Sequence, residues 1–246
     1  MKNLIKHLGV IALAALIAFS MTACSGKSGP TNFGEKLEFS GEQVYTMERV
    51  KEGDNITVNY KPYTSFDVTF DNSKITGGKF SVTRGAPSIL DVASIIEILR
   101  YINIYDNFTN VLTSDTTVKA AVIFNFGTQT GEKTLSRENT VYKNIQVTGT
   151  GEDETWSGSL TEERMIFVYV DKPVKITGTG RTETLTQKNG GTYIEKYNDL
   201  NLSLAKGWNT FYTKMDISFL TTGINITNTI SVSNPSSLKW VLVEYD

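Results

Sequence analysis

The chain has 246 residues, of which 39% are hydrophobic and 20% are charged, with 24 Lys and Arg against 26 Asp and Glu. This mildly acidic balance excludes nucleic acid as the main partner, because proteins that bind phosphate backbones need clustered Lys and Arg. A chain of this length is sufficient for one large β domain or two small ones.

The N-terminus has the layout of an export signal. Lys2 and Lys6 precede an uncharged apolar run over residues 8–19. This run fits the apolar core of a signal peptide, which is about 7 to 15 residues long, and is too short to span a bilayer as a helix of about 20 residues. The stretch Met21-Thr22-Ala23-Cys24 then places small residues directly before the single cysteine of the chain.

That stretch resembles the lipobox of bacterial lipoproteins, with Met21 where Leu or Val is usual. The resemblance covers residues 1–24 and implies a signal peptide of residues 1–23 and an acylated Cys24. Two or three acyl chains anchor a protein stably to a membrane. We therefore expect a body on the bacterial envelope, joined to Cys24 by a flexible tether over residues 24–34. The alternative is an ordinary cleaved signal peptide with an incidental cysteine.

The residue after the cysteine indicates in which membrane a lipoprotein is anchored. An acidic residue there is an inner-membrane retention cue in some bacteria, and Ser25 is not acidic. This favours the outer membrane or cell surface over the inner membrane.

The expected mature chain lacks the residues of several catalytic systems. His7, the only histidine, leaves with the signal peptide, and Cys24 is committed to lipid. Ser-His-Asp and Cys-His catalysis, His-ligated zinc and thiolate metal sites are therefore excluded. Two lysines and no acid are also removed, which leaves 22 basic against 26 acidic residues and a net charge of −4. We predict no cofactor, no metal site and no catalytic residue, which favours a protein that is not an enzyme.

Alternation of apolar and polar residues predicts strands through most of the chain. In one example, Ile56, Val58 and Tyr60 share a strand face after a turn at Gly53-Asp54-Asn55. Residues 35–87 are predicted to form a small antiparallel β unit.

One helix is predicted between the β regions, within a connection over residues 88–105. Ser88 and Asp91 match a capping box. The apolar residues that follow have helical spacing: Val92, Ile95, Ile96, Leu99 and Ile102. We expect a helix over 89–102 whose apolar stripe packs against a sheet, with partner binding as the alternative.

Residues 106–246 are predicted to form a larger antiparallel β domain, which either stands alone or shares a core with residues 35–87. The continuous apolar run over residues 165–170 indicates a central strand with both faces covered. Asn189-Gly190-Gly191 indicates a hairpin, and Trp208 and Trp240 are expected to be core anchors. The fold class is all-β, an antiparallel sandwich or barrel with one amphipathic helix.

Two acidic clusters flank a tryptophan and are the candidate ligand-binding residues. Carboxylates beside an exposed aromatic ring can bind calcium, hold the hydroxyls of a stacked sugar, or act as the acid pair of a glycosidase. The alternative is a solvated hairpin whose charges keep a sheet edge soluble. The candidates are Glu152, Asp153, Glu154, Trp156, Glu162 and Glu163.

Three functions stay open. The first is a non-enzymatic, lipid-anchored envelope protein that binds a glycan, a host protein or an envelope component. The second is a carboxylate-dependent glycan hydrolase, which needs two carboxyl groups about 5 to 9.5 Å apart across a cleft. The third is a lipocalin-like carrier of an apolar ligand, which needs a dry interior cavity.

Overall fold

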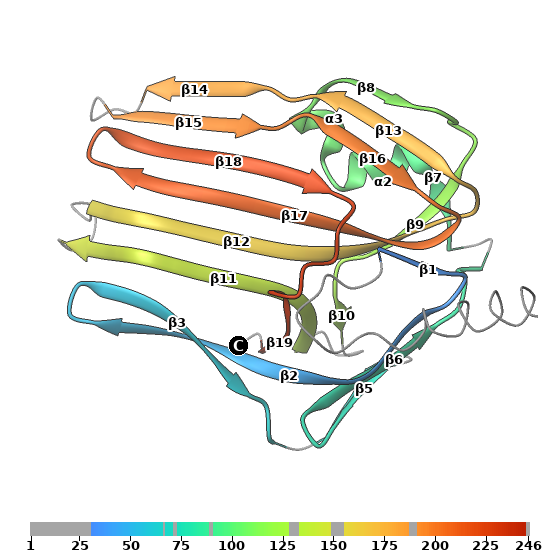
Figure 1. Cartoon of the computed structure of the whole chain (residues 1–246), viewed down its shortest axis with the longest axis horizontal. Coiled ribbons are helices and arrows are strands. Elements are labelled where there is room, and N and C mark those ends of the chain that lie inside the picture. Colours follow the sequence, from blue (N-terminus) through green and yellow to red (C-terminus); the bar gives the residue numbers. More distant parts are fainter. Residues whose placement is uncertain are drawn as a thin grey trace, which may run out of the picture.

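The structure of the chain is a computed structural model, and within the described residues it is built almost wholly of strands (Figure 1). It contains one 16-stranded sheet, one three-stranded sheet and two short helices. The prediction of an all-β chain is therefore confirmed. The described residues are 31–65, 67–70, 73–88, 91–127, 133–148, 155–186 and 191–244.

The large sheet has the strand order β14-β15-β18-β17-β12-β11-β19-β2-β6-β5-β4, with five further strands paired beside this path. Most pairs are antiparallel, but β15 with β18 and β19 with β2 are parallel. Its strands are β1 (Asn32–Gly34), β2 (Leu37–Glu52), β3 (Asn55–Pro62), β4 (Val68–Phe70), β5 (Ser73–Thr76), β6 (Lys79–Arg84), β7 (Ala93–Ser94), β9 (Lys119–Ile123), β10 (Phe126–Gly127), β11 (Lys133–Thr148), β12 (Thr155–Val170), β14 (Thr182–Thr186), β15 (Thr192–Tyr197), β17 (Gly207–Leu220), β18 (Gly223–Ser231) and β19 (Lys239–Glu244).

The small sheet and the helices form a separate layer over one end of the large sheet (Figure 1). Neither helix has the length and apolar character needed to cross a membrane, as judged over the described residues. The small sheet has the order β16-β13-β8. The elements of this layer are β8 (Thr109–Thr113), β13 (Val174–Thr179), β16 (Leu200–Leu204), α2 (Ile95–Tyr101) and α3 (Ile104–Asn107).

The C-terminal part of β12, residues 165–170, lies between two hydrophobic cores. All six residues are buried. Because successive side chains point to opposite faces of a strand, Phe167 belongs to the first core and Val168 to the second. The prediction of a central strand covered on both faces is confirmed.

The first core is rich in aromatic rings, which pack in edge-on, tilted and stacked pairs. Trp240 lies 4.4 Å from Phe80, 5.1 Å from Phe39 and 6.2 Å from Phe167, measured between ring centroids. Side chains from both predicted β regions contribute to this core. Trp208 and Trp240 are each only 2% exposed, which confirms them as core anchors.

The helix is shorter than predicted and begins later. Ser94, rather than Ser88, is its N-cap, and Glu97 completes the capping box. The reason is that Ala93 and Ser94 pair with β9 as strand β7, which keeps the backbone extended up to residue 94. The Ser88 hydroxyl instead donates to Asp91 Oδ2 at 2.6 Å in a separate turn.

The apolar stripe of α2 packs as expected. Ile95, Ile98 and Leu99 are buried in the second core, against strands of both sheets. This confirms that the helix covers a sheet. Residues 89 and 90, where the predicted helix began, lie outside the described residues.

The N-terminal part of β12, residues 155–164, extends beyond both large cores toward the hairpin ends at the left of Figure 1. A bulge in β11 shifts its register here, and Asn144 at its centre has a φ of 52°. Gly158 lies opposite with a φ of +105°, and a Cβ on it would lie 2.3 Å from the Asn144 carbonyl oxygen. Glycine is therefore required at this position, and the bulge pairs Val147 with Trp156.

Candidate functional site

A groove of about 470 Å³ lies on one face of the large sheet, where the helical layer ends. Its floor belongs to β11, β12, β17 and β18. Ile102, the C-cap residue of α2, and Asn107 of α3 line it from the helical layer, and Met47 lines it from β2. We call the sheet face that carries this groove the inner face, and the opposite one the outer face.

The inner face consists of rows of side chains in cross-strand register. Directly paired residues share a face, so each row can be read from the strand pairing. The first row is Glu138, Arg164, Thr213 and Ile230. The second is Thr140, Glu162, Met215, Asn228 and Tyr197. The third is Tyr142, Leu160, Ile217, Ile226 and Glu195.

An ion pair lies in the first row. Arg164 Nη2 is 3.3 Å from Glu138 Oε2, and the side chains are 51% and 12% exposed. The Glu138 carboxylate is therefore largely covered, while the Arg164 side chain remains exposed to the groove. The charge of Arg164 is already compensated, because cross-strand pairs of opposite charge attract each other.

A second carboxylate is fixed beside the groove by neutral donors. Glu195 accepts hydrogen bonds from the Tyr197 hydroxyl and from Asn228 Nδ2, both at 2.8 Å, and from the Tyr193 hydroxyl at 3.1 Å. Burial, followed by the hydrogen bond to Glu195, raises the pKa of Tyr197, so this phenol stays protonated and remains a donor. These bonds orient two of the side chains that line the groove.

Farther along the sheet the inner face becomes apolar. We define the apolar strip as the third-row residues Tyr142, Leu160, Ile217 and Ile226 together with the ring pair beyond them. That pair is Trp156 and Phe219, whose centroids are 5.5 Å apart. Trp156 is 38% exposed, and the strip borders a small cluster of buried aliphatic side chains.

The two predicted glutamates on β12 point in opposite directions. Glu162 lies exposed on the floor of the groove. Glu163 turns to the outer face, where it accepts hydrogen bonds from Asn139 Nδ2 at 2.8 Å, from the Tyr212 hydroxyl and from the Ser237 hydroxyl at 3.4 Å. The side chain of Glu163 therefore ties three segments together.

The remaining predicted residues are not brought to the groove. Trp156 shares the inner face with Glu162 but lies six residues away, which is about 20 Å along a strand. Cys24, Glu152, Asp153 and Glu154 lie outside the described residues.

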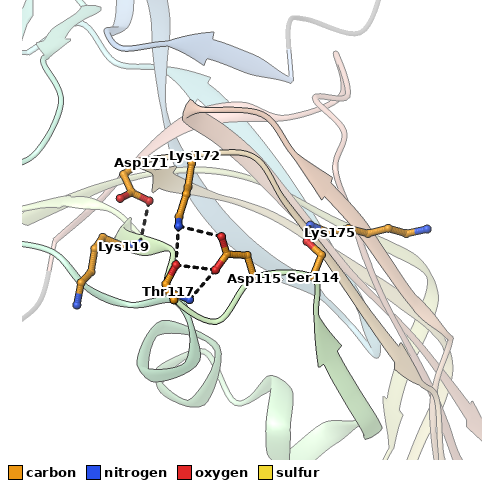
Figure 2. Close-up of polar contacts among 7 residues, drawn as sticks. All are labelled: Ser114, Asp115, Thr117, Lys119, Asp171, Lys172 and Lys175. Atoms are coloured by element: carbon orange, nitrogen blue, oxygen red, sulfur yellow. Dashed lines mark hydrogen bonds and ion pairs between the residues drawn. The ribbon is translucent and has the colours of Figure 1, made fainter.

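A second polar cluster joins the segment between β8 and β9 to the segment between β12 and β13 (Figure 2). Asp115 Oδ1 accepts from the Thr117 amide at 2.8 Å and from its hydroxyl at 2.7 Å, and Lys172 Nζ lies 2.8 Å from Asp115 Oδ2. The hydrogen bond from Lys172, followed by those from Thr117, lowers the pKa of Asp115 to about 2.

Backbone groups close the same cluster on both sides. The Lys119 amide donates to Asp171 Oδ1 at 2.9 Å, and the Lys175 amide donates to the Ser114 hydroxyl at 2.9 Å. The carboxylates of Asp115 and Asp171 thus already have internal donors (Figure 2). We assign the cluster to joining the loops rather than to ligand binding.

The groove lining supplies hydrogen-bonding groups, charges and apolar contacts. Within the described ranges, no group of three or more His, Cys, Asp or Glu side chains could hold a metal ion. The groove combines the exposed Glu162 carboxylate, two cations that are each ion-paired, amides, hydroxyls and aliphatic walls. Such a lining can orient a ligand by hydrogen bonds while burying its apolar part.

Sequence reasoning missed most of the groove. Glu138, Arg164, Tyr197 and Asn228 come from four strands, and each occupies an ordinary polar or aromatic position in an alternating pattern. Only the pairing of distant strands brings them into two rows. The local signal that was available, the acidic pair at residues 162–163, identified two residues that line the groove, of which Glu163 turns its carboxylate to the outer face.

Comparison with known proteins finds no matching family model, no matching curated protein and no matching solved structure.

Proposed function

We propose that this protein is a lipid-anchored component of the bacterial envelope whose β body binds a ligand in the groove without catalysing a reaction. The anchor is Cys24, and the location is the outer membrane or cell surface. The observation that supports binding is the groove itself, a hollow of about 470 Å³ with aliphatic walls and oriented polar groups on a sheet floor.

The carboxylates favour binding over glycan hydrolysis. Glu138 and Glu162 are diagonal neighbours on adjacent strands of the groove floor. Residues in such diagonal positions usually lie about 7 to 8 Å apart. A glycosidase needs its two carboxyl groups on either side of the scissile bond. Here both rise from one surface, and Glu138 is engaged by Arg164.

The ligand-binding half of the proposal is tested by native mass spectrometry of the full-length protein purified from its envelope. We expect a retained small molecule or fragment that is lost when Met215→Trp fills the groove. Ser218→Trp is the matched control, because it adds the same ring to β17 on the outer face. Equal retention by both variants, or no retained mass in the unmodified protein after incubation with envelope extract, would contradict binding in the groove.

The anchoring half is tested separately. Cys24→Ser is expected to move the protein from the membrane fraction to the soluble fraction, and the N-terminal peptide of the unmodified protein should carry acyl chains on Cys24. An unacylated cysteine would contradict the lipid anchor and leave the groove proposal intact.

A further inference from the structure

We propose that the groove and the apolar strip together bind a single-chain amphiphile with a cationic head, with the head at Glu162 and the chain directed toward Trp156. The inference rests on the proposed function, because it requires the inner face to be a binding surface. It adds the chemical class of the ligand and its orientation.

The two faces of this part of the sheet differ in composition. On β12, Leu160 faces inward while Ser159 and Thr161 face outward. On β17, Ile217 faces inward while Asp216 and Ser218 face outward. An antiparallel sheet with one apolar and one polar face normally packs its apolar face against another layer. Among the described residues, neither large core includes a residue of the strip. Tyr142, Leu160 and Phe219 pack against the small aliphatic cluster but remain partly exposed, so an apolar chain has a surface to cover.

Charge selects the head group. Arg164 is paired with Glu138, and Lys214, which also lines the groove, is paired with Asp216. Glu195 is satisfied by tyrosine and asparagine donors. Glu162 is exposed and makes no hydrogen bond or ion pair within the described part of the chain. An unpaired carboxylate on the groove floor attracts a cation and repels an anion.

A second charge sets the orientation. Arg49 of β2 borders the strip, with its guanidinium carbon 5.7 Å from the centroid of the Tyr142 ring. A cationic head group is repelled by Arg49 from this part of the strip and is attracted to Glu162. The chain is left to run along Leu160 and Ile217 toward Trp156, a path of about 20 Å over six strand residues. An extended dodecyl chain fits within that length.

Tryptophan fluorescence can report binding at this position. Trp156 is 38% exposed on the strip, whereas Trp208 and Trp240 are 2% exposed in the first core. Full-length protein carrying Cys24→Ser is titrated with dodecyltrimethylammonium, dodecyl maltoside and dodecyl sulfate, each below its micelle concentration. Near-ultraviolet circular dichroism checks that the core stays native. We expect a blue shift and an affinity for the ammonium compound about tenfold higher than for the sulfate.

Two pairs of variants separate the head from the chain. Glu162→Gln should weaken binding of the ammonium compound about fivefold and leave the maltoside unchanged, since an exposed ion pair is worth up to about 1 kcal/mol. Glu52→Gln, at the exposed end of β2, is its control. Ile217→Ser should weaken all three probes about tenfold or more. Val141→Ser, on the outer face, should weaken none.

The outcomes distinguish the inference from the proposed function. Equal affinity for the three head groups, lost in Ile217→Ser, would overturn the cationic head and still support a binding surface. No response to any probe in a native protein would overturn the amphiphile, and the mass-spectrometric test of the groove would then decide the proposed function by itself. Tighter, Ile217-dependent binding of a peptide of alternating Leu and Lys would overturn the amphiphile in favour of a protein partner.

Discussion

The two halves of β12 differ in what covers them. Residues 165–170 lie between two packed cores and are buried on both faces. Residues 155–164 lie beyond both cores and pair with β11 and β17, whereas residues 167–170 pair with β9 and β17. One strand thus contributes both to the packed cores and to the part of the sheet that extends beyond them. The difference shows that strand pairing extends the sheet farther than the cores require, and the uncovered part carries the groove and the apolar strip.

The largest effect should come from the packed half. Phe167→Ala removes a ring that is 1% exposed and packs against Phe39 and Trp240, so we expect a loss of about 3 to 5 kcal/mol in the free energy of unfolding. Leu160→Ala, seven residues earlier on the same strand, should lose less than about 1 kcal/mol because it is only partly buried. Denaturant unfolding of both variants measures the difference. Similar losses would show that residues 155–164 of β12 are packed as tightly as residues 165–170.

Adjacent glutamates at the border of the two halves provide a sharper contrast. Glu163→Gln weakens three hydrogen bonds to a carboxylate, which should lower the free energy of unfolding by about 1 to 2 kcal/mol. Glu162→Gln changes an exposed side chain without an internal partner and should stay within about 0.5 kcal/mol. The same denaturant assay compares them. If Glu162→Gln is the more destabilising change, the assignment of faces is wrong.

The capping box of α2 tests how the helical layer covers the packed half. Ser94→Ala removes the hydroxyl that accepts from the Glu97 amide, and about 1 kcal/mol of stability should be lost. Ser88→Ala, the cap suggested by sequence pattern, should stay within about 0.5 kcal/mol, because it disturbs only an exposed turn. Thermal unfolding of the two variants side by side makes the comparison. A reversed order would place the helix start at residue 89.

The smallest expected effect is pH-dependent and lies in the loop cluster of Figure 2. Because the folded-state pKa of Asp115 is lowered to about 2, its contribution to stability is present above the unfolded pKa of about 4 and is lost as the pH falls through 2. The unmodified protein should therefore be more stable than Asp115→Asn at pH 5 to 7, and the gap should narrow between pH 4 and pH 2. Unfolding curves over this range measure it, and a constant gap would show that the carboxylate is not engaged.

Local sequence pattern predicted what depends on a few neighbouring residues. The run over residues 165–170 indicated burial on both faces. The hairpin signal at residues 189–191 lies mostly outside the described residues, and the strands on either side of it, β14 and β15, form an antiparallel pair. The helix start was misplaced because pairing of Ala93 and Ser94 with β9 overrides a local capping signal. The rows of the inner face were not predictable, since their members are joined only by register between strands far apart in the sequence.

The position of β19 affects how the chain can fold. This strand, formed by residues 239–244, pairs on one side with β11 and on the other, in parallel, with β2 near the start of the body. The two sides of the large sheet are thus joined twice, by β3 and by β19, and the second link uses residues near the C-terminal end of the sequence. Contacts of such long sequence separation form slowly and only once both segments are present. A chain that emerges N-terminus first, from a ribosome or across a membrane, cannot place β19 between β11 and β2 until residue 244 has followed, and until then only β3 can join these two strands.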